Sequence, residues 1–271
     1  MQRGALALFD ALGFKGIWQK VTRPERVVEK LRAMQRAIDG MLQANFGGPG
    51  HPKLNDSANT IRAIRTTFLS DTVAIAVVPK TPDELHEGMR ACTSEDDLAG
   101  GAVAYAATLS GYVYRYGLTV EPAWAYRGAI AYGDFYLDDR FMVGAAVDEA
   151  ASNMNSADGA FVWLAPSAKS AFESSKTSFG GPCTPLARYV VPLKGGAGVD
   201  TFVASPFRWQ PTVADGAAVA MAIDRTFGST TDPAVAKKHL NTRAFLEQNL
   251  RELGTLHGDY ERLLAQNSRR T

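Results

Sequence analysis

The stretch GALALFDALGFKG (residues 4–16) decides how the rest of the chain is interpreted. Its first six residues are small or apolar and predict a short buried strand that ends at Asp10. Gly13 and Gly16 then mark a tight turn whose successive backbone N–H groups are free to bind an anion. A strand that ends in a carboxylate beside an amide-lined turn predicts a site for phosphoryl chemistry.

A second carboxylate, Asp71, lies at the end of a predicted hairpin formed by residues 61–68 and 72–78. If the hairpin joins the first strand in one sheet, Asp10 and Asp71 converge on the same rim. Two close carboxylates repel each other, and a divalent cation relieves that repulsion. Mg²⁺ suits such a site because it favours carboxylate and triphosphate oxygens. An Asp at a strand end followed by Gly is usually only a turn former, so these residues alone favour a structural role.

The remaining pattern predicts an α+β fold, an antiparallel sheet covered by helices, because strands and helices interleave without strict βαβ regularity. The predicted helices span residues 23–45, 96–116, 145–155 and 166–173. The further predicted strands span residues 124–132, 141–143, 160–164, 188–192 and 200–204, with a hairpin loop at 133–140. Two charged helical segments, 211–227 and 233–266, follow. We therefore expect a domain over residues 1–205 and a helical C-terminal extension over residues 206–271.

The composition excludes several classes of protein. The 271 residues are 46% hydrophobic, and 29 basic against 28 acidic residues leave a net charge of +1. This balance gives no general attraction to nucleic acid or to anionic membranes. Two distant cysteines and four scattered histidines predict neither a disulfide framework nor a zinc site. No signal peptide and no membrane-length apolar run is recognisable, so we expect a cytoplasmic protein.

Four segments, taken in order, resemble the class III nucleotide cyclases. FDALGFKG (residues 9–16) is similar to the F-x-D-h-x-G-F-T signature, where h is apolar. TTFLSDTVAIAV (66–77) resembles the hairpin that carries the second metal aspartate. YRGAIAYGDFY (126–136) is similar to R-x-G-I-x-x-G-x-V, and FMVGAAVDEAA (141–151) resembles W-G-x-x-V-N-x-A-A-R. The resemblance implies a ferredoxin-like, palm-type sheet assembled as a head-to-tail homodimer.

The departures from this family concern the residues that read purines. Thr67 stands where purine cyclases have Lys, and Phe141 where they have a base-reading Asp or Cys. Asp148 replaces the ribose-orienting Asn, and Ser152 replaces the Arg that stabilises the transition state. With both metal aspartates kept, the chain resembles the bacterial pyrimidine cyclases of the Pycsar antiphage system. That resemblance implies conversion of UTP or CTP to the cyclic monophosphate, which activates a separate effector; we favour UTP.

The resemblance also implies roles for individual residues. Asp10 and Asp71 would bridge two Mg²⁺ or Mn²⁺ ions per site, with the Ala11 carbonyl completing one shell. Lys194, in a turn that matches the family's V-K-G-K-G, would contact the triphosphate from the other half of the site. Arg127 either replaces the missing arginine or forms a structural salt bridge. The rest of the triphosphate site would be built from Phe9, Gly13, Phe14, Lys15 and Gly16.

The candidate base and ribose pocket consists of Arg65, Thr67, Phe141 and Asp148. Thr can exchange hydrogen bonds with a pyrimidine edge, Phe can stack on the ring, and Arg65 projects to the same strand face as Thr67.

Two alternatives stay open at this point. One is a degenerate cyclase-like module that binds nucleotides without turnover, and the other is a helper subunit without a ligand. A diguanylate cyclase is disfavoured, because its G-G-D-E-F-type turn is replaced here by L-S-D-T.

Overall fold

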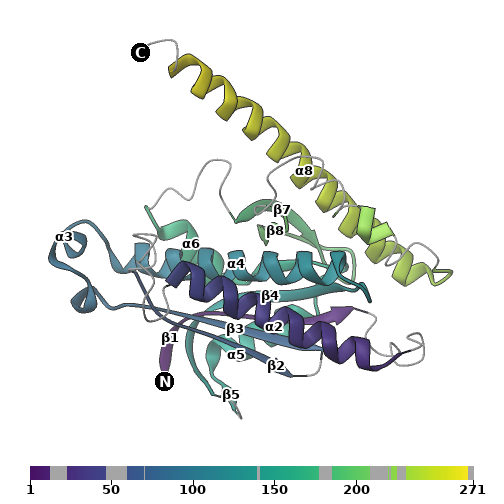
Figure 1. The fold of residues 1–271 in the computed structure, drawn as a ribbon, viewed down its shortest axis with the longest axis horizontal. Coiled ribbons are helices and arrows are strands. Elements are labelled where there is room, and N and C mark those ends of the chain that lie inside the picture. Colours follow the sequence, from purple (N-terminus) through teal and green to yellow (C-terminus); the bar gives the residue numbers. More distant parts are fainter. Residues whose placement is uncertain are drawn as a thin grey trace.

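The computed structural model describes residues 1–12, 23–46, 60–69, 71–138, 141–176, 185–207, 219, 221–224 and 230–267. Within these residues the chain forms one twisted eight-stranded sheet with helices on both faces (Figure 1). The strand order is β2-β3-β1-β4-β6-β8-β7, and β5 pairs separately with β4. Adjacent strands run antiparallel except β4 and β6, which are parallel. The predicted α+β class is confirmed.

The strands keep the predicted order along the chain. Their bounds are β1 Gln2–Leu12, β2 Ile61–Leu69, β3 Thr72–Pro79, β4 Ala125–Leu137, β5 Met142–Val143, β6 Val162–Leu164, β7 Leu186–Pro192 and β8 Gly198–Ala204. The helices alternate with them. Their bounds are α2 Glu25–Phe46, the 3₁₀ turn η2 Pro82–Glu84, α3 Glu87–Arg90, α4 Glu95–Thr119, α5 Ala145–Met154, α6 Pro166–Ser174 and α8 Pro233–Asn267.

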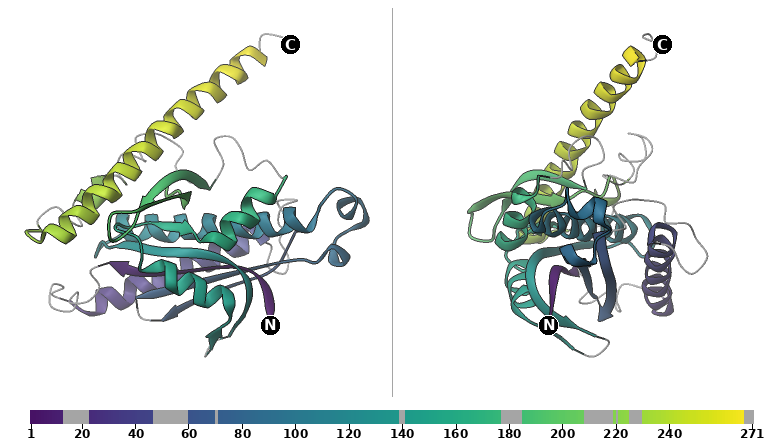
Figure 2. Two further views of the ribbon diagram at one scale, coloured as in Figure 1. Left: turned by 180° about the vertical axis from the view of Figure 1, so that it is seen from behind. Right: turned by 90° about the vertical axis from the view of Figure 1, so that its left-hand side faces the viewer.

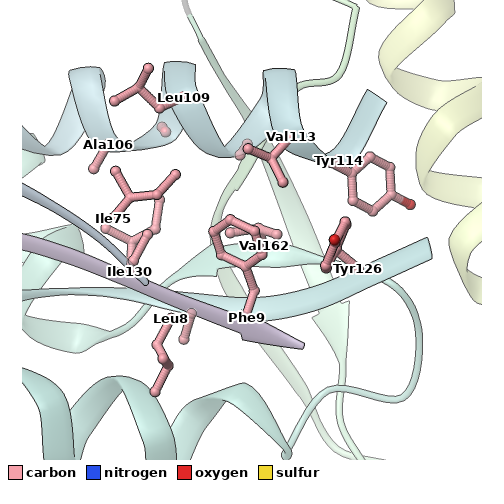
Figure 3. Close-up of a cluster of buried hydrophobic side chains, with 14 of the residues drawn as sticks. Leu8, Phe9, Ile75, Ala106, Leu109, Val113, Tyr114, Tyr126, Ile130 and Val162 are labelled. Atoms are coloured by element: carbon pink, nitrogen blue, oxygen red, sulfur yellow. The ribbon is translucent and has the colours of Figure 1, made fainter. Parts of the chain in front are cut away.

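The core lies between the sheet and α4. Phe9, Ile75 and Ile130 project from β1, β3 and β4 toward α4, whereas Leu8 projects to the opposite face, which α5 covers (Figure 3). β1 is central and buried on both faces, which explains its unbroken apolar run. Phe9 packs edge to face on Tyr126 with ring centroids 5.4 Å apart. The two faces of β1 therefore pack against different helices: α4 on one side and α5 on the other.

Two predicted strand ends are wrong. β1 continues two residues past Asp10, so this carboxylate lies within the strand rather than at its end. β4 continues to Leu137 through the segment predicted as a hairpin loop. Gly133 and Asp134 resemble turn residues, but they pair with Gly4 and Arg3, so the extension of β1 at its N-terminal end supplies the partner. The predicted strand at residues 160–164 is shorter, because only Val162–Leu164 pairs.

Lys30 fixes the turn between α4 and β4. Its ammonium donates to the carbonyls of Gly117, Val120 and Pro122 at 2.6–2.7 Å. It also lies 3.7 Å from the centroid of the Trp124 ring. Burial lowers the pKa of Lys30 to about 7, opposed by the carboxylate of Glu121. One side chain of α2 thus satisfies carbonyls at the C-terminal end of α4, immediately before β4 begins.

The C-terminal helix α8 packs against the sheet with its first half and extends beyond the rest of the molecule with its second half (Figures 1 and 2). Phe245 and Leu246 are buried in the common core. Predicted helix 211–227 falls largely outside the described residues, and the domain boundary at residue 205 stays a prediction. Within the described residues, no helix has the length and apolar character needed to cross a bilayer.

Candidate active site

The two acidic residues singled out by the sequence are neighbours at one end of the sheet. Asp10 pairs with Thr72, the first residue of β3, and the backbone N–H of Ala11 donates to the carbonyl of Asp71 at 3.1 Å. Asp71 occupies the β2–β3 turn. The backbone register brings the two residues to the same end of the sheet. A meeting of the two carboxylates around one metal site stays a prediction.

Asp10 forms a two-pronged ion pair with Arg127, which lies directly opposite it on β4. Nε of Arg127 donates to Oδ1 of Asp10 at 3.0 Å, and Nη2 donates to Oδ2 at 3.2 Å. The side chain of Asp10 is only 20% exposed and that of Arg127 only 16%. Such a paired geometry is the strongest form of an arginine–carboxylate contact. Of the two alternatives for Arg127, the structural salt bridge is present, and its partner is the candidate metal ligand itself.

The pleat places Asp10 on the sheet face that α5 covers. Asp10 is two residues from Leu8, which points to that face in Figure 3. Thr67 shares the face, because it aligns through Ala74 with Leu8. Strand spacing and rise put Thr67 roughly 12 Å from Asp10. Asp10 and the candidate base-reading strand thus lie on one sheet face, although Asp10 and Thr67 are not in direct contact within one chain.

Lys194 lies on the turn between β7 and β8, which Gly195 and Gly196 form with φ values of 96° and 93°. Burial lowers the pKa of Lys194, and the positive charges of Arg127 and Lys238 lower it further, against Asp158 and Asp10. Lys194 is therefore within electrostatic range of Asp10 in the same chain. The expectation that it contacts the triphosphate from the other half of a composite site stays a prediction.

Two of the residues expected around the base, Arg65 and Phe141, lie near the β4–β5 hairpin. Nη1 of Arg65 donates to the carbonyl of Leu137 at 3.3 Å, so its guanidinium lies beside the hairpin. Phe141 follows the hairpin turn and is 62% exposed, hence available for stacking and not a core residue. Thr67 is half-buried.

Asp148 is exposed on α5, and its carbonyl accepts a hydrogen bond from Oγ of Ser152 at 2.7 Å. The two positions at which this chain departs from the purine cyclases on α5 therefore lie one helical turn apart on the same exposed side.

One expected triphosphate contact is wrong. Phe9 is fully buried, its ring faces Tyr126, and its strand position pairs with both β3 and β4. Its side chain is a core element and not a ligand contact. Gly13, Phe14, Lys15 and Gly16 lie outside the described residues, so the amide-lined turn remains a prediction from the sequence.

No expectation from the sequence placed lysines of α8 near Asp158 and Lys194. Nζ of Lys237 binds Oδ2 of Asp158 at 2.7 Å, and Lys238 lies within electrostatic range of Lys194. Nothing in the family motifs points to these lysines. The sequence does show two adjacent lysines near the start of a predicted helix. They indicate a role only once the position of that helix relative to the sheet is known.

The acidic, His and Cys side chains of the site decide whether a divalent metal ion fits there. In the described part of the chain, no group of three or more His, Cys, Asp or Glu side chains is suited to holding a metal ion. Asp10 and Asp71, at one end of the sheet, are nevertheless of the type that Mg²⁺ or Mn²⁺ uses when a substrate brings phosphate oxygens, because Mg²⁺ is commonly held by one or two carboxylates plus phosphates. Because Arg127 binds both oxygens of Asp10, such ions can bind Asp10 only when Arg127 moves away from it.

Comparisons with known proteins give a distant likeness. No protein-family model and no curated protein matches the chain. One similar solved structure is the catalytic core of a rhodopsin-guanylyl cyclase with converted specificity in complex with ATPαS. The identity is 13% and the TM-score 0.43, with 76% of this chain and 97% of that chain covered. Similarity at this level does not establish an activity, which has to rest on the residues of the site.

Proposed function

We propose that this chain is a nucleotidyl cyclase that converts UTP to 3′,5′-cyclic UMP and pyrophosphate. The observation that carries the proposal is that the backbones of Asp10 in β1 and Asp71 in the β2–β3 turn are neighbours, with Arg127 bound to Asp10 and Lys194 within electrostatic range of it. Carboxylates for divalent cations next to cations for phosphate oxygens form the set that phosphoryl transfer requires.

Asp10, Asp71 and the carbonyl of Ala11 would hold two Mg²⁺ or Mn²⁺ ions. When bound, such ions acidify the ribose 3′-hydroxyl and neutralise the leaving pyrophosphate. The protein's own part is to hold the triphosphate in line with that hydroxyl. Lys194 and Arg127 provide positive charge for the phosphate oxygens, and the amides of residues 13–16 complete the expected cradle.

Arg127 has two roles in this proposal. Without ligands it neutralises Asp10, which otherwise would be a half-buried carboxylate beside a second one. With substrate present, its guanidinium turns to the phosphates, since the fork that fits a carboxylate also fits a phosphate. The exchange makes the Asp10 oxygens available at the moment when negative charge enters the site.

The pyrimidine preference rests on the residues that replace the purine readers. Thr67, Arg65 and Phe141 offer hydrogen bonding and stacking for a small base, and Asp148 takes the ribose-orienting position. CTP is the alternative substrate. The product would act as a cytoplasmic second messenger in antiphage defence, through an effector that the cyclic nucleotide activates. Neither nucleic acid nor membrane binding belongs to this proposal.

A head-to-tail homodimer is part of the proposal. Asp10 and Thr67 share one sheet face but lie roughly 12 Å apart by strand geometry, so one chain presents a metal end and a base end separately. A twofold axis between two such faces brings the metal end of each chain to the base end of the other and forms two equivalent sites.

A nucleotide-binding module without turnover is the second candidate. The specific observation in its favour is the two-pronged Asp10–Arg127 ion pair, which occupies both oxygens of a carboxylate that the cyclase needs for metal.

Product identification separates the two functions. The purified chain is incubated with UTP, CTP, ATP and GTP together with Mn²⁺, and the products are identified by mass spectrometry. Cyclic UMP as the main product supports the proposal, and cyclic CMP supports the alternative substrate. Binding of a nucleotide with no cyclic product from any of the four contradicts cyclase activity.

A further inference from the structure

The inner face of α8 is fixed against the loop that precedes β6. Thr242 is fully buried, and its Oγ1 accepts a hydrogen bond from the backbone N–H of Ala160 at 2.8 Å. Nδ2 of Asn241 donates to the carbonyl of Asp158 at 2.6 Å. These contacts determine which residues of the first half of α8 face the sheet.

Lys238 lies one helical turn before Thr242 and therefore on the same inner face. Oγ1 of Thr242 donates to the Lys238 carbonyl at 2.7 Å, and the Lys238 side chain is half-buried. Its neighbour Lys237 is more exposed and binds Asp158.

The Lys194 turn is tied to the same loop. The backbone N–H of Lys194 donates to the carbonyl of Ser156 at 2.9 Å, and that of Asp158 donates to the carbonyl of Pro192 at 2.8 Å. One short loop thus joins the inner face of α8 to the turn that carries Lys194.

The two lysines form an incompletely neutralised group. Asp158 is engaged by Lys237 at 2.7 Å, and Asp10 is engaged by Arg127. In the described ranges, no hydrogen bond or ion pair is recorded for the ammonium of Lys194 or of Lys238. Like charges that gather in a partly desolvated place are unfavourable unless an anion binds between them.

We propose that Lys238 is a phosphate-binding residue, so that α8 adds a third cation beside Lys194 and Arg127 for the tail of a nucleoside triphosphate. The inference rests on the proposed function for the identity of the ligand. It also assigns a role to the C-terminal helix, for which the sequence motifs provide none. An ammonium on a flexible stem suits the terminal phosphates, whose position shifts as pyrophosphate leaves.

Calorimetry with inorganic tripolyphosphate in magnesium buffer tests the inference directly. Lys238→Gln is expected to weaken tripolyphosphate binding about tenfold, the effect of one charge-assisted hydrogen bond. Lys238→Arg keeps the charge and is expected to stay within about threefold of wild type. Arg243→Gln removes one positive charge from an exposed position on the same helix and is the matched control, with unchanged affinity expected.

Three outcomes overturn the inference: no tripolyphosphate binding by the wild type, wild-type affinity in Lys238→Gln, or an equal loss in Arg243→Gln. The proposed function can fail separately. If no NTP is cyclised but tripolyphosphate binding still depends on Lys238, the phosphate site stands and the cyclase proposal falls. If cyclic nucleotide forms and Lys238→Gln leaves both KM and tripolyphosphate affinity unchanged, only the role of Lys238 is wrong.

Discussion

At the scale of single residues, the carboxylate of Asp10 has two competing positive partners: Arg127 and the proposed metal ions. Asp10 is held by Arg127 through two hydrogen bonds of 3.0 and 3.2 Å in the structure. A metal that needs Asp10 has to compete with a guanidinium already in place. The position of Asp10 next to Asp71 could be predicted from the sequence, but its ion pair could not, because Arg127 faces Asp10 only through the β1–β4 register.

Arg127→Met is expected to raise the affinity for Mn²⁺ in the absence of nucleotide, because Asp10 no longer has a competing cation. The same change is expected to weaken tripolyphosphate binding, because one phosphate partner is gone. Electron paramagnetic resonance of free Mn²⁺ and calorimetry measure the two effects. Weaker Mn²⁺ binding in Arg127→Met would contradict the idea that arginine and metal share the carboxylate.

The two aspartates are expected to differ in their effect on stability. Asp10→Asn weakens a largely buried ion pair and should lower the free energy of unfolding by about 1–3 kcal/mol, between the values for surface and buried pairs. For a chain of this length that is about 2–4 °C in Tm per kcal/mol. Asp71→Asn, for which no ion pair is recorded in the described residues, should leave Tm unchanged. Equal Tm values for the two variants would rule out a stabilising role for the Asp10–Arg127 contact.

At the scale of elements, the sequence predicted the helices well and the strand ends less well. α4 begins where Ser94 and Asp97 form a capping box, a signal that can be read locally. The end of β4 could not be read in this way, because Gly133 and Asp134 have turn-forming character and form a strand only through pairing with β1. The sequence also contained no sign that α8 approaches Lys194, since that contact depends on the packing of two distant segments.

Lys30 provides a prediction for the α4–β4 connection. Its pKa is lowered by burial to about 7, below its value of 10.5 in the unfolded chain. Between these values the unfolded state binds the proton more strongly, so this group makes stability rise with pH above about 7. The difference in unfolding free energy between wild type and Lys30→Met should therefore increase from pH 7 to pH 9. Denaturant titrations at each pH measure it, and parallel pH profiles of the two proteins would contradict the lowered pKa.

At the scale of the whole molecule, one sheet face presents two separate groups: Asp10 with its cations at one end, and Thr67 roughly 12 Å away. The layers and the order of the strands along the chain could be predicted from the sequence, because each strand carries its own apolar pattern. The order of the strands within the sheet could not, because it depends on which strands pair. The assembly could not either, since it depends on the shape of a face rather than on any motif. A homodimer remains a prediction that follows from the separation of the two groups.

Mixing two inactive variants tests that assembly. Asp71→Asn disables the metal end, and Asp148→Arg is designed to block the ribose end. Random exchange makes half of the dimers mixed, each with one intact site, so about one quarter of wild-type activity is expected to return if sites are shared between chains. Cyclic nucleotide formation after mixing gives the answer, and no recovery despite demonstrated subunit exchange would contradict shared sites.

The most direct test of the central claim is the rate at which Asp71→Asn forms cyclic nucleotide with Mn²⁺ and UTP. Loss of a carboxylate that is proposed to hold both ions should lower the rate at least about a thousandfold, or roughly 4 kcal/mol of activation free energy, with Tm unchanged. A rate equal to that of an active wild type would show that the acidic pair is not the metal site, and with it the proposed mechanism would fall.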